Sequence, residues 1–126
     1  LIISDENGIE NTDLIIENPE YNLIIVAYDL SNTNPGALKK LNDLAEEVAK
    51  EFAIRTVILT SSSSQVAQTL SSDLDLKTEF FYADAVPLKS MVRANPGLLL
   101  MKNGTVIDKW SHHLTPSFEK LSDKYF

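Results

Sequence analysis

Two apolar segments on either side of one long amphipathic segment restrict the possible folds of this chain more than any other feature. Leu23–Tyr28 is a continuous apolar run, typical of a strand buried on both faces of a sheet, and Ile54–Thr60 predicts a second buried strand. Asn34 is placed to cap a helix between them, and Pro35 suits its first turn. Apolar side chains then recur at steps of three and four and form one helical stripe: Leu38, Leu41, Leu44, Ala45, Val48, Ala49 and Phe52. This strand–helix–strand unit favours an α/β fold.

The alternation of strands and helices continues on both sides of this unit. Upstream, we expect a short strand at Leu1–Ser4 and a short helix that Asn11–Asp13 caps and Asn18-Pro19 ends. Downstream, the serines at 61–64 predict a helix cap, with Val66, Ala67 and Leu70 facing inward. The next predicted elements are a strand at Glu79–Tyr82 and a helix at Asp84–Arg93.

The C-terminal part predicts a hairpin followed by a helix. Asn103-Gly104 is a strong hairpin-turn signal between a strand at Leu98–Met101 and a returning strand at Thr105–Trp110. Thr115-Pro116 then opens a last helix, whose inward side chains are Phe118, Leu121 and Tyr125. This order of elements predicts a mainly parallel sheet with an antiparallel edge and helices on both faces.

Length and charge narrow the classes of function. The chain has 126 residues, which suits a single domain over 1–126. Eleven Lys and Arg against eighteen Asp and Glu give a net charge of −7, which disfavours nucleic acid and anionic membrane surfaces as partners. No apolar run is long enough to span a bilayer, and no signal peptide is evident. Because the chain begins at Leu1, we expect a domain excised from a larger membrane protein.

The segment from Ala94 to Val106 resembles the second half of a thioredoxin-like domain. In that family a proline with a cis peptide bond precedes an apolar strand, a Lys-Asn-Gly turn and a return strand, and Pro96 matches that proline by position. The N-terminal strand and short helix resemble the redoxin branch of the fold. The resemblance therefore implies a thioredoxin-like α/β fold, with a mixed central sheet and helices on both faces.

A narrower resemblance rests on several short motifs. Tyr28-Asp29-Leu30, Thr60–Ser63, Phe81–Asp84, Val92–Gly97 and Lys109-Trp110 are similar to the soluble C-terminal domain of DoxX-like membrane proteins from Bacteroidetes-type bacteria. This resemblance implies a domain tethered to the bacterial inner membrane by an upstream segment, with the periplasmic side favoured.

The absence of cysteine changes what this resemblance implies. A thioredoxin carries Cys-x-x-Cys at the start of its first long helix, where the helix N-terminus stabilises the thiolate. Here the corresponding segment, Ser31–Leu38, contains no cysteine, and neither does the rest of the chain. We therefore expect no thiol oxidoreductase or peroxidase activity from this domain alone, and no cofactor or metal.

The resemblance also implies a binding groove. Asn95, Pro96 and Gly97 would face the turn formed by Asn32, Thr33, Asn34 and Pro35, and an extended peptide or protein partner would pair with the proline loop like an added strand. The first hypothesis is a redox-inactive interaction module of a DoxX-like membrane protein. The alternative is an auxiliary domain that positions the substrate of a membrane thiol-redox enzyme whose cysteines lie outside this chain.

Several other residues have a structural interpretation that competes with a functional one. Asp29 lies near the position of a buried acid in thioredoxins, but without thiols a hydrogen bond to the following turn is the better interpretation. The adjacent His112 and His113 are interpreted as a polar loop rather than a metal site. Trp110 either stacks on a ligand or, as we expect, covers the sheet edge or the last helix. The run Phe80–Tyr82 is interpreted as core with one aromatic ring facing outward.

Overall fold

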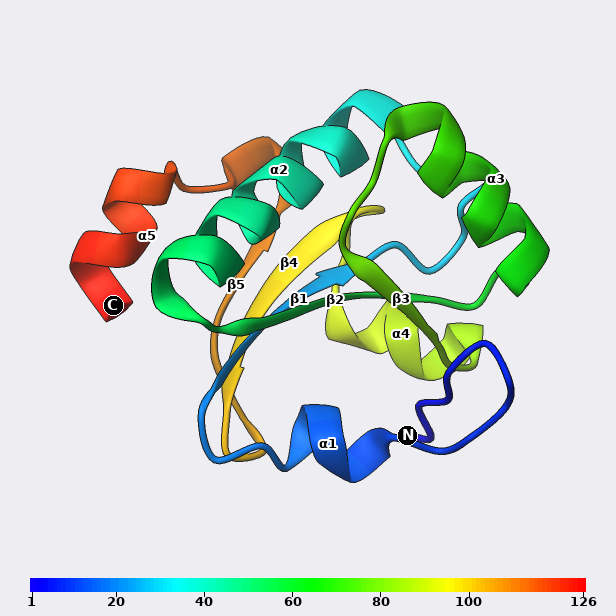
Figure 1. Cartoon of the computed structure of the whole chain (residues 1–126), viewed down its shortest axis with the longest axis horizontal. Helices are drawn as coiled ribbons and strands as arrows, with labels where there is room; N and C mark the ends of the chain where they lie inside the picture. Colours follow the sequence, from blue (N-terminus) through cyan, green and yellow to red (C-terminus); the bar gives the residue numbers. More distant parts are fainter.

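The computed structural model describes residues 1–126 and contains one five-stranded sheet in the order β3-β2-β1-β4-β5. Figure 1 shows α2, α3 and α5 covering one face of this sheet and α1 and α4 covering the other. The strands are β1 (Tyr21–Val26), β2 (Arg55–Thr60), β3 (Glu79–Tyr82), β4 (Gly97–Lys102) and β5 (Thr105–Ser111). The helices are α1 (Thr12–Ile16), α2 (Pro35–Phe52), α3 (Ser64–Leu74), α4 (Ala85–Met91) and α5 (Phe118–Tyr125). None of these helices combines the length and apolar character that crossing a bilayer requires.

The sheet is mixed, with its parallel and antiparallel parts meeting at β1. β1 pairs with β2 in parallel, and β2 pairs with β3 in parallel. β4 runs antiparallel to β1, and β5 runs antiparallel to β4. The expectation of a mainly parallel sheet is therefore wrong, because the connection through α4 returns the chain on the far side of β1 in the reverse direction. The mixed sheet with helices on both faces is confirmed.

The strands alternate their side chains between two separate cores. On the α2 and α3 side the buried strand residues are Leu23, Ile25, Ile58, Leu98 and Leu100. On the α1 and α4 side they are Ile24, Val26, Val57, Leu59, Phe81, Leu99 and Met101. Successive residues of β1, β2 and β4 thus point to opposite faces, and both faces are buried. This arrangement explains why the runs that form β1 and β4 are continuously apolar.

The predicted helix starts are mostly confirmed by their capping contacts. The Asn34 side chain accepts a hydrogen bond from the Ala37 amide at 3.0 Å, and Pro35 is the first residue of α2. Ser63 caps α3 in the same way through the Val66 amide. The prediction that Val66 faces inward is wrong: its side chain is 42% exposed, and the buried residue of α3 is Ala67.

The N-terminal strand expected at Leu1–Ser4 is reduced to isolated bridges. Ser4 and Tyr82 exchange two backbone hydrogen bonds of 2.8 Å, so Ser4 covers part of the free edge of β3. A second bridge joins Ser4 to Glu10. Only one residue therefore extends the sheet, because the turn at Asp5–Gly8 reverses the chain at once: the Asp5 amide donates to the Ile9 carbonyl.

Two buried asparagines add polar contacts that the sequence patterns do not reveal. The Asn22 side chain donates to the Ile15 carbonyl at 2.9 Å and so fastens α1 to β1. Asn42 on α2 accepts a hydrogen bond from the Thr78 amide at 3.1 Å. Both side chains are almost fully buried, so each contact satisfies a backbone group that water cannot reach. Together they fix the short α1 and the segment that enters β3.

Candidate functional site

The candidate site begins where β1 ends and the chain turns towards α2. The Asp29 side chain accepts hydrogen bonds from the Ser31 amide at 3.1 Å and from the Asn32 side chain at 2.6 Å. The Asp29 backbone carbonyl also accepts from the Asn32 amide at 3.1 Å. These contacts confirm that Asp29 hydrogen-bonds to the following turn, although Asp29 lies three residues beyond the end of β1. Its carboxylate is occupied within the turn.

Thr33 and Asn95 join this turn to the proline loop. The Thr33 hydroxyl lies 2.7 Å from both the Asp29 carbonyl oxygen and the Asn95 side-chain oxygen, so its single proton lies between two acceptors. The Asn95 side-chain nitrogen donates to the same Asp29 carbonyl at 2.8 Å. Thr33 is buried and Asn95 is half-buried. Asp29 and Thr33 from one turn and Asn95 from a distant loop therefore form one hydrogen-bonded unit just beyond the carboxyl end of β1.

The turn leaves backbone donors free beside the start of α2. The amides of Thr33 and Asn34 make no hydrogen bond within the chain. Asn32, Asn34, Pro35 and Gly36 are exposed. The positive end of the α2 dipole lies at the same place, so partner carbonyl or carboxylate oxygens are favoured here.

The proline loop also presents unpaired backbone. It runs between the end of α4 and the start of β4, and the backbone N–H and C=O groups of Arg93, Ala94 and Asn95 make no hydrogen bond within the chain. The peptide bond between Asn95 and Pro96 is cis. Pro96 itself is buried. Of the seven predicted site residues, Asn32, Asn34 and Pro35 are thus exposed and Asn95 is half-buried. The other three are buried: Thr33, Pro96 and Gly97.

Gly97 is buried because β4 passes close to the end of α4. A Cβ atom at Gly97 would lie 2.7 Å from Val92 Cγ1 and 2.8 Å from Val92 Cβ, closer than real Cβ atoms come. Gly97 is the first residue of β4 and pairs with Val26 on one side and Ser111 on the other. The absence of a side chain at this position therefore allows the proline loop to sit directly against the sheet.

No nucleophile with an adjacent base lines this site. Ser62 accepts a hydrogen bond from the Leu30 amide at 3.0 Å, and the Ser61 hydroxyl donates to the Tyr28 carbonyl, so both hydroxyls serve the loop structure. No three His, Asp or Glu side chains converge anywhere in the chain to hold a metal ion. The arrangement offers hydrogen-bonding backbone and exposed amide side chains, which suit binding more than catalysis.

The side chains of the histidine pair and of the predicted aromatic residues make no hydrogen bond with the residues of this groove. His112 and His113 belong to a short 3-10 helix (His112–Leu114) rather than to the loop that we expected, with ring centroids 3.8 Å apart. Burial lowers the pKa of His112, and the neighbouring His113 lowers it further. Trp110 packs against the α2-side core, and Phe81 is buried in the opposite core.

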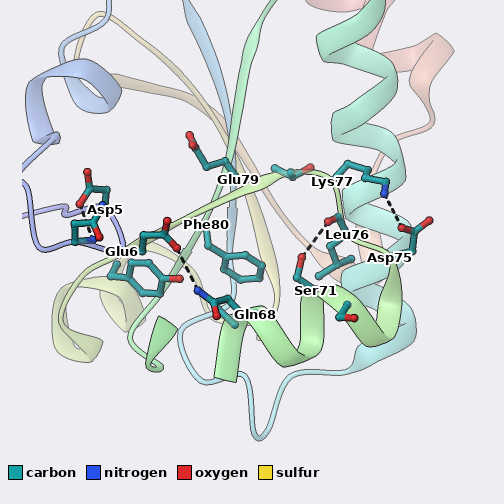
Figure 2. Close-up of a pocket in the computed structure, with 14 residues that line it drawn as sticks. Asp5, Glu6, Gln68, Ser71, Asp75, Leu76, Lys77, Glu79 and Phe80 are labelled. Carbon is teal, nitrogen blue, oxygen red and sulfur yellow. Dashed lines mark hydrogen bonds and ion pairs between the residues drawn. The ribbon is translucent and has the colours of Figure 1, made fainter. Parts of the chain in front are cut away.

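A separate hollow lies at the other edge of the sheet, between the N-terminal loop, α3 and β3 (Figure 2). It encloses about 670 Å³ and contains none of the predicted site residues. The Gln68 side chain donates to Glu6 across its rim at 3.2 Å, and Lys77 pairs with Asp75 at 2.8 Å. Burial raises the pKa of Tyr82, and the charge of Glu6 raises it further. The sequence patterns gave no signal for this hollow, because its wall includes a loop that folds back from a distant part of the chain.

Comparison with known proteins gives a clear result for the fold only. No protein-family model matches the chain, and no curated protein matches it. Among solved structures, a thiol-disulfide oxidoreductase from Bacteroides fragilis is similar with a TM-score of 0.73 and 12% identity, over 98% of this chain and 96% of that one. The exposed lipoprotein thioredoxin Etrx1 of Streptococcus pneumoniae has a TM-score of 0.69 and 14% identity, over 98% and 96%. A secreted Mycobacterium tuberculosis disulfide oxidoreductase has a TM-score of 0.66 and 11% identity, over 98% and 92%.

These similarities establish a thioredoxin-like α/β fold over nearly the whole chain. The similar structures carry names that refer to thiol chemistry, whereas the present chain has no cysteine. At the junction between β1 and α2, this chain has Asn32, Thr33, Asn34 and Pro35. The fold is therefore shared, and the side chains at the junction offer hydrogen bonds rather than sulfur.

Proposed function

We propose that this chain is a thioredoxin-like interaction module without thiol chemistry of its own. Its binding site is the proline groove, defined as Asn32–Pro35 together with Asn95–Gly97. The partner is an extended peptide or a protein segment. The observation that carries the proposal is the unpaired backbone of Arg93–Asn95, held beside the free amides of Thr33 and Asn34 by the contact between Thr33 and Asn95.

An extended peptide satisfies such a site through its own backbone. Unpaired N–H and C=O groups on a loop can add a strand, because each backbone hydrogen bond replaces two bonds to water without needing a particular side chain. The hydrogen bonds around Asp29 hold both walls of the groove before binding. A preformed groove loses little conformational freedom when the peptide binds, which favours affinity.

The pairing mode can be tested with two labelled peptides. The first is fluorescein-Ser-Val-Glu-Val-Ser-amide, and the second replaces both valines by proline, which removes two backbone donors. In fluorescence anisotropy titrations the valine peptide is expected to bind and the proline peptide to bind about 5- to 150-fold more weakly, since two lost hydrogen bonds cost roughly 1–3 kcal/mol. Equal affinities, or no binding by the valine peptide, would contradict strand addition at the proline groove.

A membrane attachment belongs to the same proposal. The motifs Tyr28-Asp29-Leu30, Phe81–Asp84 and Val92–Gly97 support a place in a DoxX-like membrane protein of Bacteroidetes-type bacteria. In that setting the domain is held at the inner membrane, on the periplasmic side, and meets partners there. Fractionation of the native organism with an antibody against this domain tests the placement. Recovery in the cytoplasmic fraction alone would contradict it.

A second candidate function follows from the similar solved structures, two of which are named disulfide oxidoreductases. In this version the domain positions a substrate for cysteines that lie elsewhere in the same membrane protein. The proline groove still binds an extended segment, but that segment is a thiol or disulfide substrate. A parent protein without paired cysteines near the membrane surface would remove this candidate and leave the interaction module.

A further inference from the structure

A small pocket adjoins the proline groove on the side of β5. It encloses about 230 Å³ and is lined by five residues: Val92, Arg93, Lys109, Trp110 and Ser111. Arg93 begins the unpaired loop segment, and Ser111 pairs with Gly97 at the start of β4. The pocket is smaller than the roughly 300–1,000 Å³ of sites for whole small molecules. Its size and position suit one side chain of a peptide that lies along the proline loop.

The charges of this pocket differ from those of the rest of the molecule. The chain carries a net charge of −7, yet no acidic residue lines the pocket. Arg93 and Lys109 are both exposed, and neither forms an ion pair; among the eleven basic residues only Lys39, Lys77 and Lys124 are paired with an aspartate. Two cations therefore lie free at one small pocket beside the groove.

The nearest acid in the sequence is directed elsewhere. The Asp108 carboxylate accepts a hydrogen bond from the Tyr125 hydroxyl and lies 3.6 Å from the Lys124 ammonium nitrogen, both on α5. On β5 the side chains of Asp108 and Lys109 point to opposite faces of the sheet. The backbone amide of Lys109 donates to the Asp108 carboxylate at 2.9 Å, but the Lys109 ammonium group has no partner. No acidic side chain of this chain therefore neutralises Arg93 or Lys109 at the pocket.

We infer that this pocket is a subsite for an acidic side chain of the bound peptide, glutamate or aspartate. The inference rests on the proposed peptide function of the proline groove. Val92, on the same face of the sheet as Lys109, provides apolar surface for the methylene groups of the acidic residue, and Arg93 and Lys109 face its carboxylate. The partner is therefore an extended segment with an acidic residue beside the part that pairs with the proline loop.

The test compares three peptides that differ at one position. Fluorescein-Ser-Val-Glu-Val-Ser-amide is titrated beside the versions with glutamine or lysine in place of glutamate. The glutamine peptide is expected to bind about two- to fivefold more weakly than the glutamate peptide, as fits an exposed pair of charges, and the lysine peptide more weakly still. The difference should shrink when salt is added, because exposed charges are screened.

Variants assign this preference to the pocket. Arg93→Gln and Lys109→Gln should each reduce the ratio of the glutamate peptide's affinity to the glutamine peptide's affinity towards one. Lys120→Gln removes the same charge from an exposed position on α5 and should leave the preference intact. Equal binding of all three peptides at the proline groove would overturn the acidic subsite alone. Failure of all three to bind would overturn both the subsite and the peptide function.

Discussion

The Thr33 hydroxyl lies 2.7 Å from the side-chain oxygen of Asn95, a residue 62 positions further along the chain. The same hydroxyl and the Asn95 side-chain nitrogen both contact the backbone carbonyl of Asp29, three residues after the end of β1. The turn before α2 and the loop before β4 are thus tied through one backbone oxygen. This contact holds the two walls of the groove together. Substitutions at Thr33 and Asn95 should therefore change the free energy of unfolding.

Replacing Thr33 by valine should destabilise the chain although it preserves the side-chain shape. Thr33 is buried, and its loss leaves the Asn95 side-chain oxygen without a donor. We expect Thr33→Val to lower the free energy of unfolding by about 1–2 kcal/mol, measured by urea denaturation. Asn95→Ala should cost a similar amount, and the double variant should cost less than the sum. Additive effects would show that the two side chains act independently.

Replacing Thr78 by valine should have the opposite sign. The Thr78 hydroxyl oxygen is buried and has no hydrogen-bond partner, so it is desolvated without compensation. Valine has the same shape and no hydroxyl group. We expect Thr78→Val to raise the free energy of unfolding by about 1 kcal/mol in the same urea assay. The exposed Thr105, whose hydroxyl also has no partner within the chain, serves as the matched control, and its change to valine should alter stability by less than about 0.5 kcal/mol. A destabilised Thr78→Val protein would contradict this account of the hydroxyl.

Two glycine positions should respond differently to alanine. At Gly97 the new methyl group would press on Val92, and we expect a loss of about 1–3 kcal/mol from overpacking. At Gly36, in the first turn of α2, the nearest atom to a new Cβ is the Asn34 side-chain oxygen at 3.5 Å, an ordinary contact. Gly36→Ala should therefore be neutral or stabilising by up to about 1 kcal/mol. Thermal unfolding of the two variants compares them directly, and equal midpoints would be inconsistent with the packing at Gly97.

The pH dependence of stability should report on Asp108. The hydrogen bond from Tyr125 holds the pKa of Asp108 below its ordinary value, and the Lys109 amide and the Lys124 ammonium group act in the same direction. Because the pKa is lower in the folded chain than in the unfolded one, this stabilisation is present above about pH 4 and is lost as the pH falls through the folded-state value.

Asp108→Asn should therefore lower stability near neutral pH and flatten its fall in acid. Asp123→Asn removes the same charge from α5 at an exposed site without an ion pair, and it serves as the control. Urea midpoints measured across the acid range should separate the two variants. An Asp108→Asn curve parallel to that of the unmodified chain would rule out the proposed role of the Tyr125 contact.

Much of the fold could be predicted because its signals are local. Asn34 and Pro35 identify the start of α2, and the strand at Glu79–Tyr82 has the predicted bounds. Asn103-Gly104 joins β4 to β5, and both residues have positive φ there. These features depend on the steric and hydrogen-bonding properties of neighbouring residues, which the sequence states directly.

The failures concern contacts between distant segments. The direction of β4 depends on how α4 crosses the sheet, which no residue pattern specifies. Val66 is exposed because the stripe that α3 buries centres on Ala67, and α3 begins only one turn before it. Ser4 forms a bridge rather than a strand because its turn follows immediately.

The candidate site was predicted only in outline. The resemblance placed Asn95 opposite the Asn32–Pro35 turn, and the structure brings Asn95 and Thr33 together. It could not show that Pro96 and Gly97 are buried, nor that the Asp29 carbonyl joins the two walls. The free cations at Arg93 and Lys109 also become neighbours only when β5 folds beside the loop. Spacing in the sequence does not carry this information.

A residue-resolved binding map tests the central claim most directly. Uniformly nitrogen-15-labelled protein is titrated with unlabelled acetyl-Ser-Val-Glu-Val-Ser-amide, and amide shifts are followed by nuclear magnetic resonance. We predict that the largest shifts fall on the amides of Asn32–Asn34, Gly36, Arg93–Asn95 and Gly97, with Lys109 and Ser111 following. Shifts confined to the hollow around Glu6 and Gln68, or an unchanged spectrum, would contradict binding at the proline groove.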